Sequence, residues 1–399
     1  MIKIDDRFCN EYSNISKEEK EKLLKIRETI YRKDKMLDWI DISTCITENE
    51  LNEVINIGNE IRNNCDVFLV VGIGGSFLGS KAIIDALSPY FNKSKPEIIF
   101  LGYNLSLEYL NEVLEYIKDK NIYVNVISKS GNTLETDVAF QTIYNHMKEN
   151  IIDYKERIII TTGKTGKLRE LINKENFKSF DVPDDIGGRF SVLTVVGLLP
   201  LVLAEINVMK LLDGAKDNYD CFDEASRLAI IRKHLEDDKK GVEAITYYEE
   251  KLKGLALWYQ QLFAETQGKN NKGILPIINP NTTNLHSLGQ YLQEGKKQIF
   301  ETVLKVERIN ETNLYYNGYK IDDLNNIVLE QVAIAHQDGD TSSIIISIPE
   351  LNEYYLGGLI YFLEMVSTIG AYLLDIYPFD QPGVEKYKQN VRNVLNDII

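Results

Sequence analysis

Short apolar segments alternate with amphipathic segments through the first half of the chain. Runs rich in β-branched residues predict strands at 67–71, 97–101, 123–127 and 157–161. The segments between them carry apolar residues at helical spacing and predict helices at 81–87, 107–118 and 134–148. Regular alternation of strand and helix is typical of a parallel sheet with right-handed crossovers. The pattern therefore predicts an α/β fold that binds ligands beyond the carboxyl ends of its strands.

The remaining segments predict flanking helices and a second lobe. Helices are expected at 16–37, 50–63, 190–206, 255–264 and 357–374, and the third of these is so apolar that it should be buried. The charge-rich stretch 210–240 predicts exposed helix and connector, and strands are predicted beyond it at 273–278, 299–306 and 343–348. We expect an N-terminal helical segment (1–48), a first α/β domain (49–209), a charged helical connector (210–240) and a second domain with a C-terminal helix (241–399).

Composition narrows the class of protein. A chain of 399 residues with 44% hydrophobic content is long enough for two lobes, because single cores stop growing at about 250–300 residues. No apolar stretch approaches the roughly 20 residues of a membrane span, and the charged N-terminus is unlike a signal peptide, so we expect a cytoplasmic protein without membrane contacts. A net charge of −15 argues against nucleic acid as a partner.

Cysteine and histidine usage gives no sign of a metal site. The four cysteines are scattered without a Cys-x-x-Cys pair, which is typical of free thiols in a reducing compartment. No two of the four histidines are spaced as ligands on one helix face. We therefore expect no metal.

Hydroxyl groups gather around one lysine where the third predicted strand ends. Residues 128–133 read Ser-Lys-Ser-Gly-Asn-Thr and stand between a predicted strand and a predicted helix. Amides at a helix N-terminus favour anions, hydroxyls add neutral donors, and Lys129 adds positive charge. These features indicate a clamp for a phosphate monoester. A capped turn, in which Ser128 or Ser130 satisfies free amides, explains the same residues.

A glycine-rich turn follows the first predicted strand. Residues 70–81 read VVGIGGSFLGSK. The dinucleotide fingerprint fails because its third glycine would fall on Phe77, and the Walker pattern fails because Ser80 follows Gly79 in place of lysine. The turn, with Ser76 at the start of the helix, favours close backbone approach to a sugar or phosphate. Tight packing of strand against helix is the alternative.

Four further segments hold residues with catalytic potential. Arg189 follows two glycines and would be a fixed donor for developing negative charge, although a structural salt bridge is the commoner fate of a single arginine. Glu265 ends an apolar helix and reads as a surface residue by periodicity. His286 lies between a strand and a helix, and the segment 378–389 carries Gln381 and then Lys388. Each of these residues taken alone is compatible with a structural role.

Taken together, the segments closely resemble the phosphoglucose isomerase family in its shorter bacterial form. The matching motifs occur in the family's order: GIGGS at 72–76, SKSGNTLET at 128–136, GGRFS at 187–191, ETQGK at 265–269, NLHSLGQ at 284–290 and FDQPGVEKYKQ at 379–389. The resemblance implies two sugar-isomerase lobes, each a doubly wound and mostly parallel sheet. It also implies the conversion of glucose 6-phosphate to fructose 6-phosphate through a cis-enediol in glycolysis and gluconeogenesis, without a cofactor.

The resemblance assigns roles residue by residue. Glu265 matches the base that moves a proton between C2 and C1, Arg189 the group that steadies the enediolate, and His286 and Lys388 the residues that open the sugar ring. Substrate-binding and phosphate-binding positions match at Gly75, Ser76, Ser128, Lys129, Ser130, Thr133 and Gln381. The family's histidine comes from a neighbouring subunit, so a homodimer or larger homo-oligomer is implied, with His286 supplied across the interface.

Departures and alternatives remain at this stage. Thr266 and Gln267 follow the glutamate where related chains often have serine and another polar residue, and His336 is a rival to His286 for the histidine role. A related isomerase acting on mannose 6-phosphate is one alternative activity. A non-catalytic phosphosugar sensor is another, but such proteins usually carry a basic DNA-binding module, which this sequence lacks.

Overall fold

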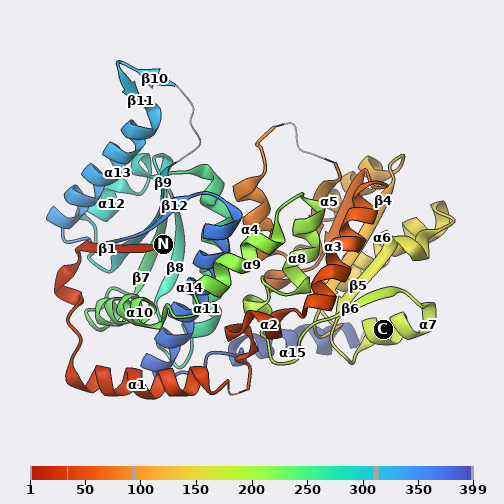
Figure 1. Ribbon diagram of the computed structural model, residues 1–399, viewed down its shortest axis with the longest axis horizontal. Coiled ribbons are helices and arrows are strands. Elements are labelled where there is room, and N and C mark those ends of the chain that lie inside the picture. Colours follow the sequence, from red (N-terminus) through yellow and green to blue (C-terminus); the bar gives the residue numbers. More distant parts are fainter. Residues whose placement is uncertain (1, 34, 92–94, 309–313, 397–399) are drawn as a thin grey trace.

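Two five-stranded sheets lie side by side, each wrapped by helices (Figure 1). The computed structural model describes residues 2–33, 35–91, 95–308 and 314–396. Both sheets are mostly parallel, as the alternation of strand and helix predicts. The α/β class is confirmed.

The first sheet has the strand order β3-β2-β4-β5-β6 and is wholly parallel. Every residue of β2 is buried, and its side chains alternate between two cores on opposite faces of the sheet. This burial on both faces explains a continuous apolar run in place of an alternating one. The strands are β2 (Val67–Val71), β3 (Glu97–Leu101), β4 (Ile122–Ser128), β5 (Ile158–Thr162) and β6 (Lys178–Asp181).

Helices cover both faces of this sheet. One face holds α3, α4 and α8, with α8 in contact with both of the others, and the other face holds α5, α6 and α7. The helices of this half are α3 (Glu48–Arg62), α4 (Leu78–Leu87), α5 (Leu107–Ile117), α6 (Leu134–Asn150), α7 (Lys167–Glu175) and α8 (Val195–Leu203).

The second sheet has the order β1-β12-β9-β7-β8. Its edge strand β1 (Lys3–Phe8) runs antiparallel to β12, so the N-terminal segment predicted as helical also supplies a strand to the second lobe. The other strands, β7 (Val242–Tyr247), β8 (Leu275–Pro280), β9 (Ile299–Arg308) and β12 (Ser343–Glu350), are parallel.

The helices around the second sheet are α10 (Phe222–Asp237), α11 (Lys253–Gln267), α12 (Gly289–Glu294), α13 (Ile321–Asp338) and α14 (Glu353–Leu373). Four further helices join or flank the lobes, namely α1 (Lys17–Tyr31), α2 (Ile42–Cys45), α9 (Val208–Asp217) and α15 (Pro382–Asn396). A small hairpin of β10 (Tyr315–Tyr316) and β11 (Tyr319–Lys320) projects from the second lobe at the top of Figure 1.

The stretch 210–240, expected to be exposed helix and connector, is helical but only partly exposed, because α9 and α10 each bury part of their surface. Helix α10 packs on α14 and buries residues on several sides. Its Arg232 is 2% exposed and donates to Glu243 on β7, with 2.5 Å between Nη2 and Oε2. Buried charges of this segment have polar partners: Arg232 pairs with Glu243, and Lys240 Nζ donates to the carbonyl oxygen of Asp340.

Helix α14 is the central helix of the molecule. By length and composition it could cross a membrane, which differs from the expectation that no apolar stretch approaches that length. However, 94% of the relevant 18-residue window is buried inside the protein, where α14 packs on α9, α10 and α11. No other helix among the described residues meets the same criterion. The apolar character of α14 is thus explained by its place in the core.

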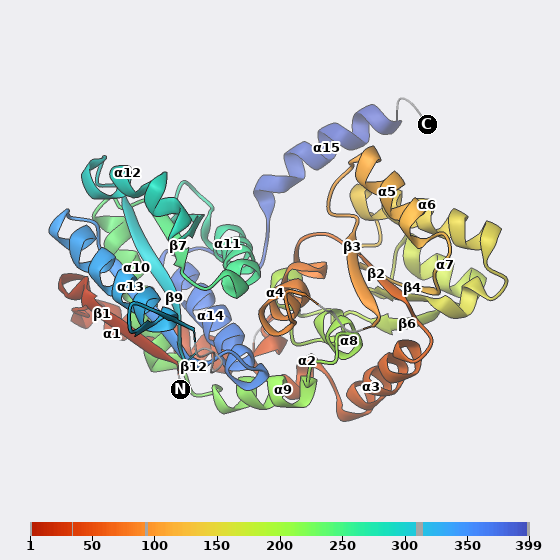
Figure 2. The same ribbon diagram turned by 90° about the horizontal axis from the view of Figure 1, so that it is seen from above.

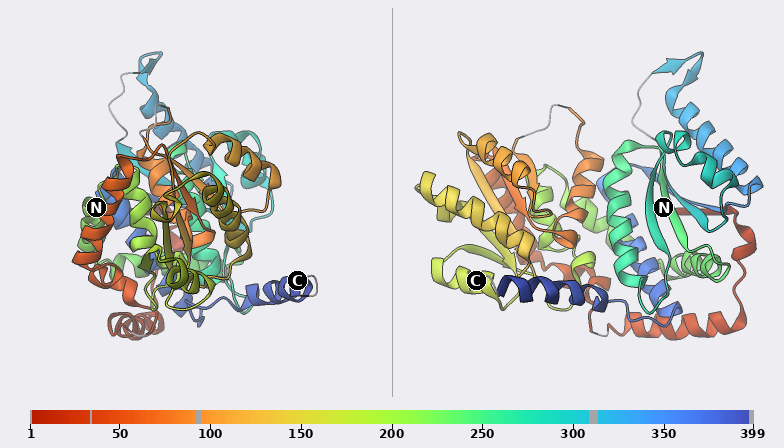
Figure 3. Two further views of the ribbon diagram at one scale, coloured as in Figure 1. Left: turned by 90° about the vertical axis from the view of Figure 1, so that its right-hand side faces the viewer. Right: turned by 180° about the vertical axis from the view of Figure 1, so that it is seen from behind.

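Helix α15 stands out from the body of the molecule. In Figures 2 and 3 it leaves the junction of the lobes and extends alongside the first lobe without joining it. None of its side chains that the structure describes is fully buried. The helix that carries Lys388 thus has no fully buried anchor among its described side chains.

Candidate active site

The candidate site forms where the carboxyl ends of β2 and β4 face helix α11 of the other lobe. A glycine turn, Gly74–Ser76, follows β2, and a second turn, Gly188–Phe190, lies directly against it. Both turns contact α11. Residues far apart in sequence meet at this junction, as expected for the open edge of a parallel sheet.

Arg189 and Glu265 form an ion pair at this junction. The Arg189 side chain is 3% exposed, and its Nη1 lies 3.2 Å from Glu265 Oε2, whose side chain is 30% exposed. Arg189 Nε donates to Thr266 Oγ1 at 2.8 Å, and Nη2 donates to the carbonyl oxygen of Pro378. Burial lowers the pKa of the Arg189 guanidinium below its ordinary value, and the Glu265 carboxylate offsets part of that effect. The guanidinium is thus fixed on three sides.

Two amides complete the surroundings of the Glu265 carboxylate. Gln261 Nε2 donates to Oε1 at 2.9 Å, and Gln381 Nε2 donates to Oε2 at 2.5 Å. The segment before Gln381 is tied to α11 because Lys269 Nζ donates to the carbonyl oxygen of Tyr377 and to Asp380. Periodicity alone indicates that Glu265 is a surface residue, and its side chain is in fact partly exposed, but its carboxylate points into a set of donors.

The glycine turn after β2 is shaped by its neighbours. A Cβ on Gly75 would lie 2.1 Å from the carbonyl oxygen of Gly188, so only glycine allows the two turns to touch. A Cβ on Gly74, at φ +60°, would lie 2.8 Å from Gln261 Nε2. Ser76, at the end of the turn, is partly exposed. Gly75 and Ser76 therefore lie against the segment that carries Arg189.

The loop after β4 presents the N-terminus of α6. Ser128 Oγ accepts the Gly131 N–H at 3.2 Å and lies 3.4 Å from Thr133 Oγ1, and Ser130 Oγ accepts the Asn132 N–H. Thr133 precedes α6 but its side chain caps no amide of the helix. The serines thus satisfy amides within the loop, as in the capped-turn interpretation, while the first amides of α6 have no side-chain cap. Such a terminus favours an anion.

Lys129 braces this loop against the segment before Arg189. Its Nζ donates to the carbonyl oxygens of Asp184 and Ile186 at 2.7 and 2.8 Å. Burial lowers the pKa of the Lys129 ammonium, and the charges of Asp184 and Asp185 offset part of that effect. An ammonium has three hydrogens, and two are engaged in these bonds.

The structure does not bring His286 or Lys388 to the Glu265 carboxylate. His286 is exposed in a short turn, Thr283–His286, after β8, and no hydrogen bond or ion pair of its ring is found among the described residues. Lys388 is 43% exposed on α15 and pairs with Glu385 at 3.3 Å. The rival His336 is 3% exposed and bonded to Glu301.

Sequence reasoning missed Gln261 and Lys269 and treated Thr266 only as a departure. Gln261 lies one helical turn before Glu265 on the same face of α11, so the spacing of four residues was an available signal. No sequence pattern pointed to Lys269, because its partners lie about a hundred residues away. No group of three or more His, Cys, Asp or Glu side chains suited to a metal ion occurs among the described residues.

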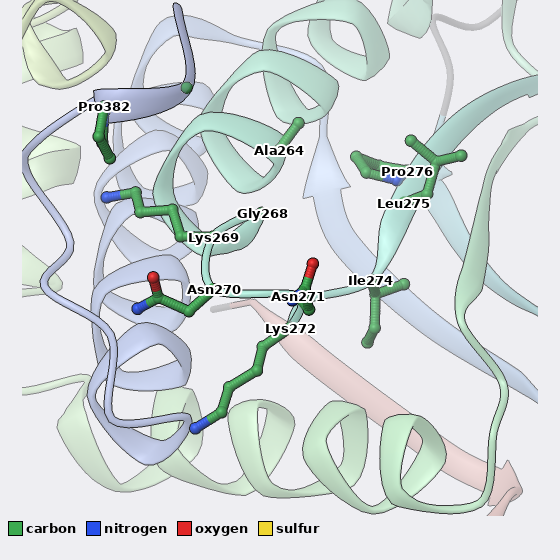
Figure 4. A pocket seen from close by; sticks show the side chains of 12 residues that line it. Ala264, Gly268, Lys269, Asn270, Asn271, Lys272, Ile274, Leu275, Pro276 and Pro382 are labelled. Atoms are coloured by element: carbon green, nitrogen blue, oxygen red, sulfur yellow. The ribbon is translucent and has the colours of Figure 1, made fainter.

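A cavity of about 770 Å³ lies beside the C-terminal end of α11 (Figure 4). It is lined by the loop 268–273 and by Pro382, and by none of the residues to which the family resemblance assigns a role. Lys269 and Lys272 line it, but their ammonium groups donate to the backbone carbonyls of Tyr377 and Leu374. The cavity therefore lies next to the candidate site, but Arg189, Glu265 and Gln381 do not line it.

Comparisons with known proteins identify relatives along most of the chain. Residues 55–305 match the sequence profile of phosphoglucose isomerase. Glucose-6-phosphate isomerases of Alkaliphilus metalliredigens and Clostridioides difficile are 41% and 39% identical, over 91% and 90% of this chain and 87% and 86% of theirs.

Solved structures give the same picture of the fold. A hypothetical protein from Thermus thermophilus aligns with a TM-score of 0.89 at 26% identity, covering 99% of this chain and 100% of that one. A glucose-6-phosphate isomerase from Chlamydia trachomatis aligns with a TM-score of 0.79 at 21% identity, covering 88% and 74%. The profile match and the identities of these relatives show that the chain belongs to the phosphoglucose isomerase family.

Proposed function

We propose that this protein interconverts glucose 6-phosphate and fructose 6-phosphate, with Glu265 as the base that carries a proton between C2 and C1. The single observation that carries this proposal is that Arg189 and Gln381 both donate hydrogen bonds to the Glu265 carboxylate, at the junction between the lobes. Aldose to ketose conversion needs a carboxylate near the carbon-bound proton and a fixed cation near the oxygens of the enediolate. The pairing of Glu265 with Arg189 supplies both.

We assign both proton transfers at carbon to the Glu265 carboxylate. Glu265 removes the C2 proton, and the electron pair left behind forms the C1–C2 double bond as negative charge develops on O1. Arg189 stays positive throughout, because a guanidinium does not lose its proton at neutral pH. The O2 hydroxyl proton passes to O1, and the C2–O2 carbonyl forms as the same carboxyl returns its proton to C1. The side-chain amides of Gln261 and Gln381, which donate to its two oxygens, fix the orientation of this carboxylate.

The phosphate end of the substrate is assigned to the loop after β4. Ser128, Ser130, Thr133 and the first amides of α6 are neutral donors at a helix N-terminus, and Lys129 would use its third hydrogen. Contacts to Gly75, Ser76 and Gln381 are assigned to the sugar. Binding energy gained at the unreactive phosphate would orient the reacting carbons.

Ring opening is assigned to His286 and Lys388, and we propose that His286 acts in the site of a second subunit. Two observations support this assignment. The site built from Arg189 and Glu265 has no histidine among its described hydrogen-bond partners, and His286 is exposed with its ring unengaged. A homodimer would complete the site. We place the reaction in the cytoplasm, since a charged phosphosugar does not cross a bilayer unaided.

Replacing Glu265 with glutamine tests the central assignment. The Glu265→Gln variant keeps the shape of the side chain but has no base, so turnover should fall by about 10³-fold or more. Binding of fructose 6-phosphate, measured by calorimetry, should stay within about threefold because the phosphate loop is intact. Full turnover by this variant in a coupled assay with either sugar phosphate would disprove the assignment.

A further inference from the structure

A buried polar cluster lies behind the turn that carries His286. Its centre is Glu301 on β9, which is 2% exposed. Glu301 Oε2 accepts a hydrogen bond from His336 Nδ1 on α13 at 2.5 Å, and Oε1 accepts one from Thr246 Oγ1 on β7 at 2.9 Å. Asn279 on β8 and Ser343 on β12 also donate to it, so four elements of the second lobe supply its partners. Its orientation is therefore fixed.

Asn279 links the cluster to the turn that follows β8. Its Nδ2 donates to Thr246 Oγ1 at 2.9 Å and to Glu301 Oε1 at 3.2 Å, and the residue is fully buried on β8. With its nitrogen directed at the carboxylate, its Oδ1 faces the turn after β8. There it accepts a hydrogen bond from Asn284 Nδ2 at 3.1 Å.

Asn284, two residues before His286, forms hydrogen bonds with the two residues that follow the histidine. Its Oδ1 accepts from Ser287 Oγ at 3.1 Å, and its carbonyl oxygen accepts from the backbone N–H groups of Ser287 and Leu288 at 3.1 and 2.7 Å. His286 lies inside the bracket formed by these bonds. These bonds fix the backbone of the turn from which the exposed His286 side chain projects.

We propose that Asn284 is a positioning residue for His286, held in place through Asn279 by the Glu301 and His336 pair. The proposal rests on the role proposed above for His286 in ring opening. Burying a carboxylate and a histidine costs folding free energy unless each has its hydrogen-bond partners. Such a network contributes more to a defined geometry than to stability. His336 then takes part indirectly, because it is too buried to meet a sugar.

The test is a double-mutant cycle between Asn284 and His286. Asn284→Ala should lower kcat for fructose 6-phosphate by about 10–100-fold, with KM within about twofold, because the phosphate and sugar contacts are untouched. In the His286→Ala background the same change should lower kcat by less than about twofold further. A merely structural effect would be equal in both backgrounds and would overturn the proposal.

A control and a second variant sharpen the result. Asn325→Ala removes a similarly half-buried asparagine of the same lobe, whose Nδ2 donates to the carbonyl oxygen of Tyr248, and should leave kcat within about twofold. Asn284→Asp keeps the acceptor for Ser287 but turns the donor toward Asn279 into an acceptor, so it should be as slow as the alanine variant. Wild-type kcat in Asn284→Asp would overturn the proposal.

The outcomes separate this inference from the proposed function. If His286→Ala keeps wild-type turnover, the role of His286 fails and this inference fails with it. If His286→Ala is inactive and Asn284→Ala has no effect, only the positioning role fails. Circular dichroism and thermal unfolding of each variant show that it is folded before its kinetics are compared.

Discussion

The Arg189 guanidinium and the Glu265 carboxylate are 76 residues apart in sequence and 3.2 Å apart in space. The arginine comes from a turn beyond the first sheet and the glutamate from α11 of the second lobe. Their pairing therefore depends on how the two lobes meet. A buried cation that a neighbouring hydroxyl and carbonyl also hold keeps its position when charge develops on the substrate.

Thr266 should affect turnover by holding the Arg189 guanidinium in position. Thr266→Val removes the acceptor for Arg189 Nε, and a buried donor without a partner costs about 1–3 kcal/mol. We expect kcat to fall by about tenfold with a small change in KM. Thr266→Ser keeps the hydroxyl and should stay within about twofold of wild type. Steady-state kinetics of the two variants check this, and equal loss in both would contradict it.

Gly75 should tolerate no side chain. A methyl group at this position would lie 2.1 Å from the carbonyl oxygen of Gly188 and would push the turn that carries Arg189. Gly75→Ala should lower the free energy of unfolding by about 1–3 kcal/mol and reduce kcat at least tenfold. Gly241→Ala is the matched control, because a Cβ there meets nothing within 4 Å. Wild-type kinetics in Gly75→Ala would show that the two turns move apart freely.

Glu364 should make the protein less stable as pH rises. It is buried in α14 with one oxygen unpaired among the described residues, and burial raises its pKa well above the ordinary value. The folded state therefore binds the proton more tightly than the unfolded state. Stability contributed by the protonated form is complete below the ordinary pKa and declines as pH rises toward the folded value.

Glu364→Gln is the variant that checks this sign. It cannot ionise, so its unfolding temperature should exceed that of wild type at pH 8, and the difference should shrink as pH falls toward 4.5. Thermal unfolding between pH 4.5 and 8 measures the two curves. Parallel curves across this range would mean that Glu364 does not titrate between the folded and unfolded states.

Two inactive variants should restore activity to each other if the site is shared between subunits. Glu265→Gln retains His286, and His286→Ala retains Glu265, so a mixed dimer has one complete site. Dissociation and reassociation of equal amounts should recover about a quarter of wild-type activity, since half of the dimers are mixed and each has one working site. No recovery, with mixed dimers confirmed by differently tagged chains, would place His286 and Glu265 in one subunit.

Much of the fold was available from the sequence because local patterns are strong there. Strand β2 was predicted at its observed bounds, since a run buried on both faces has a distinct apolar signature. Strands β1 and β7 were missed because Asp5, Asp6 and Glu243 interrupt their apolar character. Glu243 is tolerated in β7 because Arg232, Tyr259 and Thr302, on three other elements, donate hydrogen bonds to its carboxylate in the core.

The sequence by itself determined the α/β class, the glycine turn at Gly75, the hydroxyl loop from Ser128 to Thr133, and the resemblance that selected Glu265 and Arg189. Those are local motifs, and short segments of chain define them. Only the tertiary structure decided that Glu265 is enclosed by donors, that Lys129 braces the segment before Arg189, and that His286 and Lys388 lie apart from the carboxylate. Periodicity along one helix records which face is apolar, whereas the chemistry of a side chain depends on what other elements bring to it.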